Sequence, residues 1–213
     1  MNNFYERESQ CEAVFARLGT VVHLWTNENF EIIFTCNDDF KAGMNIVGLC
    51  AGLFPGLTIL TFELMSNHIH FTLCGTEEDV ISFFNVLKKH LSKYFRKERR
   101  AINWDNFLEK HRVLHSLNDA RNVIVYNNRN GYLVNDNHTP FTYPWGANRF
   151  YFNQELRCLA LSNAKDLPFQ TRRVCFCSHA ADRISKIPSF DGYALPTSFC
   201  KIEEGERLFT SVM

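Results

Sequence analysis

The strongest constraint on the fold is the stretch EEDVISFFNVLKKHLSKYFRKERR, residues 77–100. Apolar side chains recur along it at three- and four-residue intervals, which places them on one face of an α-helix. These residues are Val80, Phe83, Phe84, Leu87, Leu91, Tyr94 and Phe95. Thr76, followed three residues later by Asp79, forms a variant of the capping box and marks the start of the helix. A helix with such a stripe must bury it against a second layer of structure.

The stretches before this helix supply that second layer. Several are rich in β-branched and aromatic residues, as strands are. The expected strands are residues 21–26, 30–36, 57–65 and 68–74, and the expected helices are residues 8–19, 38–54 and 77–100. The turn NEN joins the first two strands, and Ser66-Asn67 joins the last two as a hairpin. This order predicts an α+β fold in which helices cover an antiparallel sheet.

The composition bounds the class of protein. The 213 residues are 46% hydrophobic, which is typical of a folded globular domain. No apolar run is long enough to cross a bilayer and the N-terminus is too polar for a secretory signal, so we expect a cytoplasmic protein without a membrane partner. With 23 basic and 23 acidic residues, the net charge does not argue for a nucleic-acid partner.

The two ends of the chain and its cysteines say less about the fold and the function. Residues 1–18 are expected to form an N-terminal helix, and residues 151–213 a C-terminal appendage of short helices and irregular structure, because the pattern weakens there. The eight cysteines are scattered, as reduced thiols are. The stretch CFCSH at 175–179 does not have the Cys-x₂₋₄-Cys spacing of structural zinc sites, so buried thiols are favoured over zinc.

His68 and His70 stand out within the strand 68–74. Side chains alternate along a strand, so the two histidines project from one face and Ile69 from the other. Two neutral imidazoles on a rigid sheet supply two ligands of a facial metal site. The alternative is a pair of sheet histidines that bind backbone groups or face solvent. The two residues alone favour this alternative, and a third ligand with a nearby reactive group would reverse it.

The segment LMSNHIHFTL, residues 64–73, resembles the signature strand of the single-tyrosine HUH transposases, and most of all the branch of REP-associated tyrosine transposases. The usual motif there is hydrophobic-Met-Pro-Asn-His-hydrophobic-His, followed by a long helix as here, and Ser66 replaces the proline. A looser second match is NVIVYNNRNGYLV, residues 122–134, where Tyr126 and Asn130 keep the family's four-residue spacing and Gly131 takes the place of a proline. The resemblance covers about residues 19–145.

Local propensity and the resemblance disagree over residues 122–134. Valine, isoleucine and tyrosine prefer strands, and Asn-Gly between apolar runs is a hairpin signal. On a helix, by contrast, Tyr126 and Asn130 lie one turn apart on the same face. Asn118 or Asp119 would then cap the helix and Asn130-Gly131 would end it. The resemblance favours the helix.

The resemblance implies a ferredoxin/RRM-like HUH fold for a catalytic domain at residues 19–150. It also implies metal-dependent cleavage and strand transfer of single-stranded or hairpin DNA through a covalent 5′-phosphotyrosine. Tyr126 would be the nucleophile, and His68, His70 and Asn130 would hold Mg²⁺ or Mn²⁺. A phenol with a pKa near 10 is a weak nucleophile, and the metal would assist it by polarising the phosphate oxygens. Monomer and homodimer both remain open.

The basic residues give candidate DNA contacts. Residues 88–100 contain seven lysines and arginines against one glutamate, at the end of the helix where cations also favour the dipole. We expect this surface to contact phosphates, although a solvated helix face is the plainer alternative. The candidates are Lys88, Lys89, Lys93, Arg96, Lys97, Arg99 and Arg100, together with Arg121 and Arg129 near Tyr126.

Two other functions remain open. Ser66 and Gly131 depart from the family motif, which would suit a domesticated protein that binds hairpin DNA without cleaving it. A metal hydrolase would use His68 and His70 with a carboxylate such as Glu63. Glu63 lies five residues before His68 and seven before His70, an odd number in both cases. Alternation along one straight strand would send it to the opposite face, an objection that the turn between Glu63 and the histidines weakens.

Overall fold

The computed structural model describes residues 2–134, 137–157, 162–163, 188–190 and 192–210. Its centre is a four-stranded antiparallel sheet with the strand order β2-β3-β1-β4. The strands are β1 (Val21–Thr26), β2 (Thr58–Leu64), β3 (Ile69–Cys74) and β4 (Glu109–Leu114). The long helices are α1 (Asn2–Leu18), α2 (Asn37–Leu53), α3 (Glu77–Lys97) and α4 (Leu117–Val134). The predicted α+β class is confirmed.

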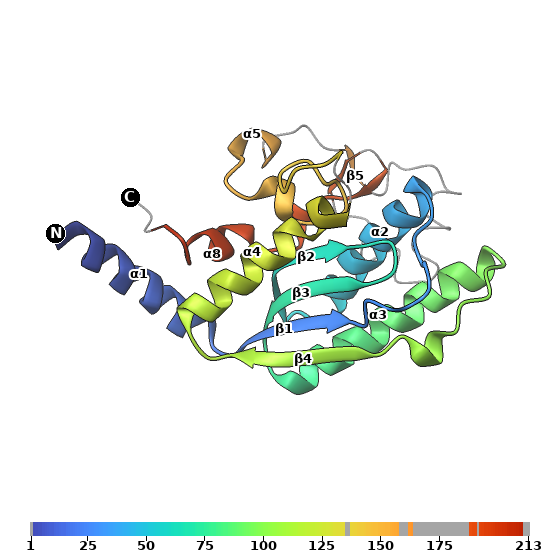
Figure 1. Cartoon of the computed structure of the whole chain (residues 1–213), viewed down its shortest axis with the longest axis horizontal. Coiled ribbons are helices and arrows are strands. Elements are labelled where there is room, and N and C mark those ends of the chain that lie inside the picture. The colour runs from blue at the N-terminus through green and yellow to red at the C-terminus, as the bar shows by residue number, and fades with distance from the viewer. Residues whose placement is uncertain (1, 135–136, 158–161, 164–187, 191, 211–213) are drawn as a thin grey trace.

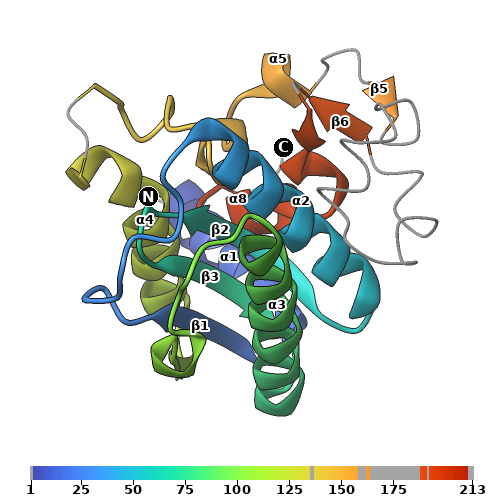
Figure 2. The same cartoon turned by 90° about the vertical axis from the view of Figure 1, so that its right-hand side faces the viewer.

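The sheet lies between two layers of helices. Helices α2 and α3 cover one face, and α4 crosses the other (Figures 1 and 2). All seven residues of the apolar stripe predicted for α3 are buried. They meet side chains such as Phe71, whose ring lies 5.4 Å from that of Phe83. The predicted cap is also confirmed, because the Asp79 backbone N–H donates to the Thr76 hydroxyl at 3.1 Å.

The strand expected at residues 30–36 is wrong, since the structure has no strand there. Both edges of β1 are already paired, one with β3 and the other with β4, so a neighbouring hairpin strand has no place beside it. The segment is instead an extended loop. The backbone N–H groups of Ile33 and Phe34 both donate to the Ser66 carbonyl, at 2.7 and 2.9 Å, and the burial of both side chains anchors the loop in the core.

Other ends of elements differ in detail from their predictions. Helix α1 begins well before residue 8 and ends as expected at Gly19, whose φ of +71° suits a glycine that terminates a helix. The N-cap of α2 is Cys36, while Asp38 and Asp39 lie in the first turn of the helix and do not cap it. Asp39 instead accepts hydrogen bonds from the Thr35 backbone and from Arg100, at 2.9 and 2.7 Å.

The C-terminal part covers the outer edge of β2. The Lys201 N–H donates to the Ile59 carbonyl, and the Leu64 N–H donates to the Trp145 carbonyl, both at 2.8 Å. The shorter elements are α5 (Gln154–Arg157), β5 (Ser162–Asn163), β6 (Pro188–Phe190), β7 (Tyr193–Ala194) and α8 (Ile202–Glu206). Leu195, Ile202 and Leu208 are buried in the main core, so the described part of residues 192–210 packs as part of the same body.

Two expectations on composition meet the structure only in part. Of the cysteines in the described ranges, Cys11, Cys36, Cys50, Cys74 and Cys200 are all free thiols, whereas residues 175–179 lie outside those ranges. None of the helices that the structure describes is long and apolar enough to cross a membrane.

Candidate active site

The site begins with the register of the sheet. His70 on β3 is paired with Trp25 on β1 and with Glu63 on β2. One step along, Thr72 is paired with His23 and Thr61. Directly paired residues project from the same face of an antiparallel sheet, so these polar side chains gather on the face toward α4.

His68 and His70 lie side by side on this face. Their ring centroids are 4.9 Å apart, and Ile69 between them is fully buried on the other side of the sheet. The Oδ1 atom of Asn67 lies 2.7 Å from His68 Nδ1 and holds that ring in place. The strand alternation therefore predicted the placement of the two imidazoles correctly.

A carboxylate completes a cluster with the histidines. Glu28, in the turn after β1, joins His68 and His70 so that one ligand atom from each lies within 4.8 Å of the others. Nothing in the sequence singles out Glu28, because an exposed acidic residue in a turn has no periodicity. The only signal was its position just after β1, the strand that pairs with His70.

The chemistry of these donors suits a divalent cation. Both histidines must be neutral to act as ligands, and burial lowers the pKa of His68 and brings that of His70 to about 2. Imidazole and carboxylate together suit Mn²⁺ and related ions, whereas Mg²⁺ prefers oxygen ligands.

Unsatisfied polar atoms concentrate at the same place. Both ring nitrogens of His70 are buried without a hydrogen-bond partner among the described residues, as is Nε2 of His23. Buried polar atoms are normally paired, so such a group calls for an explanation such as an ion. The residues present therefore fit a metal.

Helix α4 brings Tyr126 to this cluster. The phenolic oxygen lies 3.4 Å from Oε1 of Glu28, and the tyrosine ring meets the His70 ring edge-on with the centroids 5.4 Å apart. Burial and the Glu28 carboxylate both raise the pKa of Tyr126, while the positive charge of Arg129 lowers it. The geometry thus puts a phenol beside the three candidate metal ligands, and the raised pKa favours its neutral form.

Residues 117–134 form one helix, so the hairpin alternative is wrong. Tertiary packing overrides the strand preference of this segment, because Leu117, Ala120 and Ile124 bury one face of the helix. The cap is Ser116, whose hydroxyl accepts a hydrogen bond from the Asp119 N–H at 3.1 Å. The predicted stop at Asn130-Gly131 is also wrong, since the helix continues to Val134.

The glycine at 131 has a local explanation. A Cβ at this position would lie 2.2 Å from the Tyr143 ring, and its backbone N–H donates to the Glu63 carboxyl at 2.9 Å. A proline would lose that hydrogen bond. The departure from the family motif is therefore accommodated by Tyr143 and Glu63 and needs no loss of function to account for it.

Glu63 itself contradicts the expectation from alternation. It lies on the adjacent strand, directly opposite His70, and so shares the histidine face. Its carboxyl binds α4, however, and burial raises its pKa to about 8, which keeps it neutral near pH 7. The carboxylate whose oxygen lies near both His68 and His70 is that of Glu28, and Glu63 is not part of this cluster.

Asn130 is buried on α4 one turn after Tyr126, and its Nδ2 atom has no hydrogen-bond partner among the described residues. No contact of Asn130 with the histidine pair supports its predicted role. That role stays a prediction, while Glu28 is the carboxylate that the structure brings to His68 and His70.

The predicted DNA contacts fall into three groups. Arg129 is exposed and lines the cleft at Tyr126. Arg121 is engaged elsewhere, because its guanidinium binds Glu8 at 2.8 and 3.0 Å. Arg100 binds the Ile33 carbonyl and Asp39 in the loop before α2. Of the remaining candidates, Lys88, Lys89, Lys93, Arg96 and Lys97 lie on α3 and Arg99 lies in the turn just after it, and α3 covers the sheet face opposite the histidines.

The cleft at Tyr126 has a volume of about 610 Å³. Its walls come from β1, β3, β4 and α4. The lining includes His23, Trp25, Glu28, His70, Arg112, Tyr126 and Arg129. Arg112 and Trp25 were not predicted, because neither belongs to a motif.

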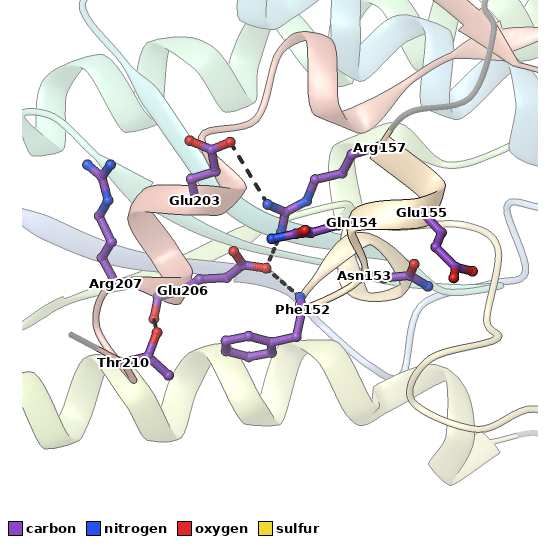
Figure 3. A pocket seen from close by; sticks show the side chains of 9 residues that line it. All are labelled: Phe152, Asn153, Gln154, Glu155, Arg157, Glu203, Glu206, Arg207 and Thr210. Carbon is purple, nitrogen blue, oxygen red and sulfur yellow. Dashed lines mark hydrogen bonds and ion pairs between the residues drawn. The ribbon is translucent and has the colours of Figure 1, made fainter. Parts of the chain in front are cut away.

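A second cleft of about 750 Å³ lies between residues 152–157 and 203–210 (Figure 3). Its cations already have partners. Arg157 points toward Glu203, 3.9 Å away, and forms a closer ion pair with Glu206, while Arg207 binds Glu204 at 2.8 Å. These internal ion pairs make it a weaker candidate than the cleft at Tyr126.

Comparisons with known proteins add no assignment, because no family model, no curated protein and no solved structure matches this chain.

Proposed function

We propose that this protein cleaves and rejoins single-stranded DNA, including hairpin DNA, with Tyr126 as the nucleophile and a divalent cation held by His68, His70 and Glu28. The observation that carries the proposal is the meeting of a tyrosine from α4 with a His-His-Glu cluster on the sheet. The Tyr126 hydroxyl lies 3.4 Å from a Glu28 oxygen, and the cluster atoms lie within 4.8 Å of one another.

The topology supports the finer fold assignment. The main sheet is built in the order β1-α2-β2-β3-α3-β4, with β1 and β3 at its centre. This β-α-β-β-α-β order is that of ferredoxin-like folds. We therefore extend the resemblance of the segment LMSNHIHFTL to the fold and propose an HUH-like domain with α4 as the helix that carries the nucleophile.

The residues of the site divide the chemistry between them. When bound, Mn²⁺ or Mg²⁺ would polarise the non-bridging oxygens of the scissile phosphate. The Tyr126 phenol loses its proton as its oxygen forms a bond to phosphorus, the bond from phosphorus to the 3′-oxygen breaks, and that oxygen takes up a proton, which leaves a 5′-phosphotyrosine and a free 3′-hydroxyl. Attack of that hydroxyl on the phosphotyrosine reverses the step and rejoins the strand.

The electrostatics indicate what this tyrosine needs. Its pKa is raised first by burial and then by the negative charge of Glu28. A cation bound to Glu28 would offset the negative charge that raises the pKa of Tyr126, and the positive charge of Arg129 already lowers that pKa. The proposed reaction is therefore expected to depend strictly on a divalent cation.

A covalent-adduct assay tests the proposal. The protein is incubated with Mn²⁺ and single-stranded oligonucleotides that carry hairpins and a label at the 3′ end, because the fragment on that side of the cut stays on the tyrosine. Labelled protein is detected on a denaturing gel. We expect an adduct with wild type, none with Tyr126→Phe, and an undiminished adduct with Tyr132→Phe. Tyr132 is a suitable control because it lies on the same helix but is 47% exposed. An equal adduct in Tyr126→Phe would refute the assignment.

A second candidate is a protein that binds hairpin DNA without cleaving it. The raised pKa of Tyr126 favours it, since a phenol held neutral by burial and a neighbouring carboxylate is a poor nucleophile. Binding of the same oligonucleotides, with no adduct at any Mn²⁺ or Mg²⁺ concentration, would establish this function instead.

A further inference from the structure

We infer that Trp25 is a stacking platform for a base of the single-stranded DNA, next to the phosphate that Tyr126 attacks. The inference rests on the proposed function and extends it by naming a contact with the substrate. It starts from the position of Trp25 on β1, directly opposite His70, on the sheet face that also carries His23.

The indole is held in a fixed orientation. Its ring stacks on the His23 ring, with the centroids 4.6 Å apart and the planes at 24°. The His23 ring in turn stacks on that of His70, at 5.7 Å and 16°. The three nearly parallel rings run from Trp25 to the proposed metal ligands. A rigid aromatic surface of this kind loses little conformational entropy when a base stacks on it.

Trp25 differs from the other tryptophans in what surrounds it. Trp145 is buried and stacks on Phe40, and Trp104 packs against Phe95 and Phe107 on the α3 side of the sheet. Trp25 and Trp104 are both half-buried, but only Trp25 of the two lines the cleft that also contains Tyr126. The core therefore accounts for the other two tryptophans and leaves part of the Trp25 ring to the cleft.

Positive charges surround the platform. Lys110 is exposed and directly opposite Trp25 on β4, and Arg129 is exposed on α4. Neither forms an ion pair with any residue that the structure describes. Arg112 is opposite His23 and is held by Asp119 through two hydrogen bonds of 2.8 Å. Aromatic rings beside cations are the usual means of binding single strands, where bases stack and phosphates are neutralised.

The spacing connects the platform to the reaction. Only the His23 ring separates Trp25 from Tyr126, since its centroid lies 4.6 Å from the Trp25 ring and 6.2 Å from the Tyr126 ring. A nucleotide whose phosphate reaches Tyr126 would place a neighbouring base over Trp25. Because every base has a π-face, this contact sets the position of the strand and tolerates any sequence.

The test is an abasic scan of binding, done in EDTA so that no cleavage occurs. The probe is a fluorescein-labelled single-stranded oligonucleotide with a hairpin, and each nucleotide beside the hairpin is replaced in turn by an abasic site. With wild type we expect one position at which removal of the base weakens binding about 5- to 150-fold. With Trp25→Leu, the affinity for the intact probe should fall by the same factor. The abasic site at that position should then lower the affinity of this variant no further.

Two further variants control for folding. Trp25→Phe keeps a smaller ring and should retain part of the affinity, with an unchanged circular dichroism spectrum. Trp104→Leu makes the same substitution on the opposite side of the sheet and should show the wild-type scan. The inference is overturned if no single base matters to wild type, if Trp25→Leu or Trp25→Phe shows the wild-type scan, or if no probe binds. Because the scan is independent of adduct formation, a failure of Tyr126 to react would not be confused with a failure at Trp25.

Discussion

The two faces of the central sheet have opposite chemistry although they share the same strands. On the face toward α2 and α3, Phe71 and the side chains around it form a fully apolar core. On the face toward α4, His23, Glu63 and His70 are buried, and each has at least one polar atom without a partner among the described residues. Polar atoms buried in this way lower stability. The first face therefore stabilises the fold, and the second keeps buried polar groups that the described residues leave unpaired.

The largest effect is expected on the apolar face. Phe71→Ala should lower the free energy of unfolding by about 3–5 kcal/mol, because it leaves a cavity between the sheet and α3. Urea unfolding followed by circular dichroism measures the change. A loss below about 1 kcal/mol would mean that this face is not the packed core described here.

The second-largest loss of stability is expected where α4 packs against the polar face. Gly131→Ala places a methyl group 2.2 Å from the Tyr143 ring and should cost about 1–3 kcal/mol. Gly52→Ala is the matched control, because Gly52 also lies in a helix but has nothing within 4 Å of the added Cβ. That control should gain about 0.5–1 kcal/mol. Equal thermal unfolding temperatures for the two variants would contradict the seating of α4.

The polar face should also make stability depend on pH. Burial raises the pKa of Glu63 from 4.5 to about 8, so between these values the folded state binds a proton that the unfolded state has released. The contribution is complete below pH 4.5 and is lost as the pH rises toward 8, with a slope of at most about 1.4 kcal/mol per pH unit.

Glu63→Gln should flatten this decline, and urea unfolding at pH 6.5, 7, 7.5 and 8 measures it. The difference between the wild-type and Glu63→Gln curves isolates Glu63, because His23, His68 and His70, whose lowered pKa values make stability rise with pH, are present in both proteins. A wild-type decline that persists unchanged in Glu63→Gln would assign it to another group.

The smallest expected change is a gain in stability. His70→Val removes two buried nitrogens without partners and supplies a residue that suits a strand, so in EDTA it should stabilise the protein by about 1 kcal/mol. Thermal unfolding in EDTA measures it. Destabilisation by more than about 1 kcal/mol would show that His70 has a structural partner and is not kept for a ligand.

Features with a strong local pattern could be predicted from the sequence. The stripe on α3, its Thr76 cap and the shared face of His68 and His70 follow from the periods of helices and strands, and the structure has all three. The loop at residues 30–36 could not be predicted, because its composition is that of a strand and only the pairing of β1 with β3 and β4 excludes it.

The rest of the site depends on contacts between distant segments. Glu28 reaches the histidines only because β1 lies beside β3. Position 131 takes a glycine because Tyr143 leaves no room for a side chain and Glu63 accepts a hydrogen bond from the backbone N–H. Residue type and spacing contain neither fact. For α4, local propensity indicated a hairpin, and packing against the sheet decided for the helix.

We propose that the polar face holds a divalent cation at Glu28, His68 and His70. Titration with Mn²⁺ followed by electron paramagnetic resonance tests it most directly, since bound and free Mn²⁺ give different signals. We predict one ion bound per chain in wild type, loss of that ion in His70→Val, and unchanged binding in His111→Ala, whose imidazole lies near Glu77 at 3.4 Å. Absence of Mn²⁺ binding in wild type, or equal binding in His70→Val, would contradict the account.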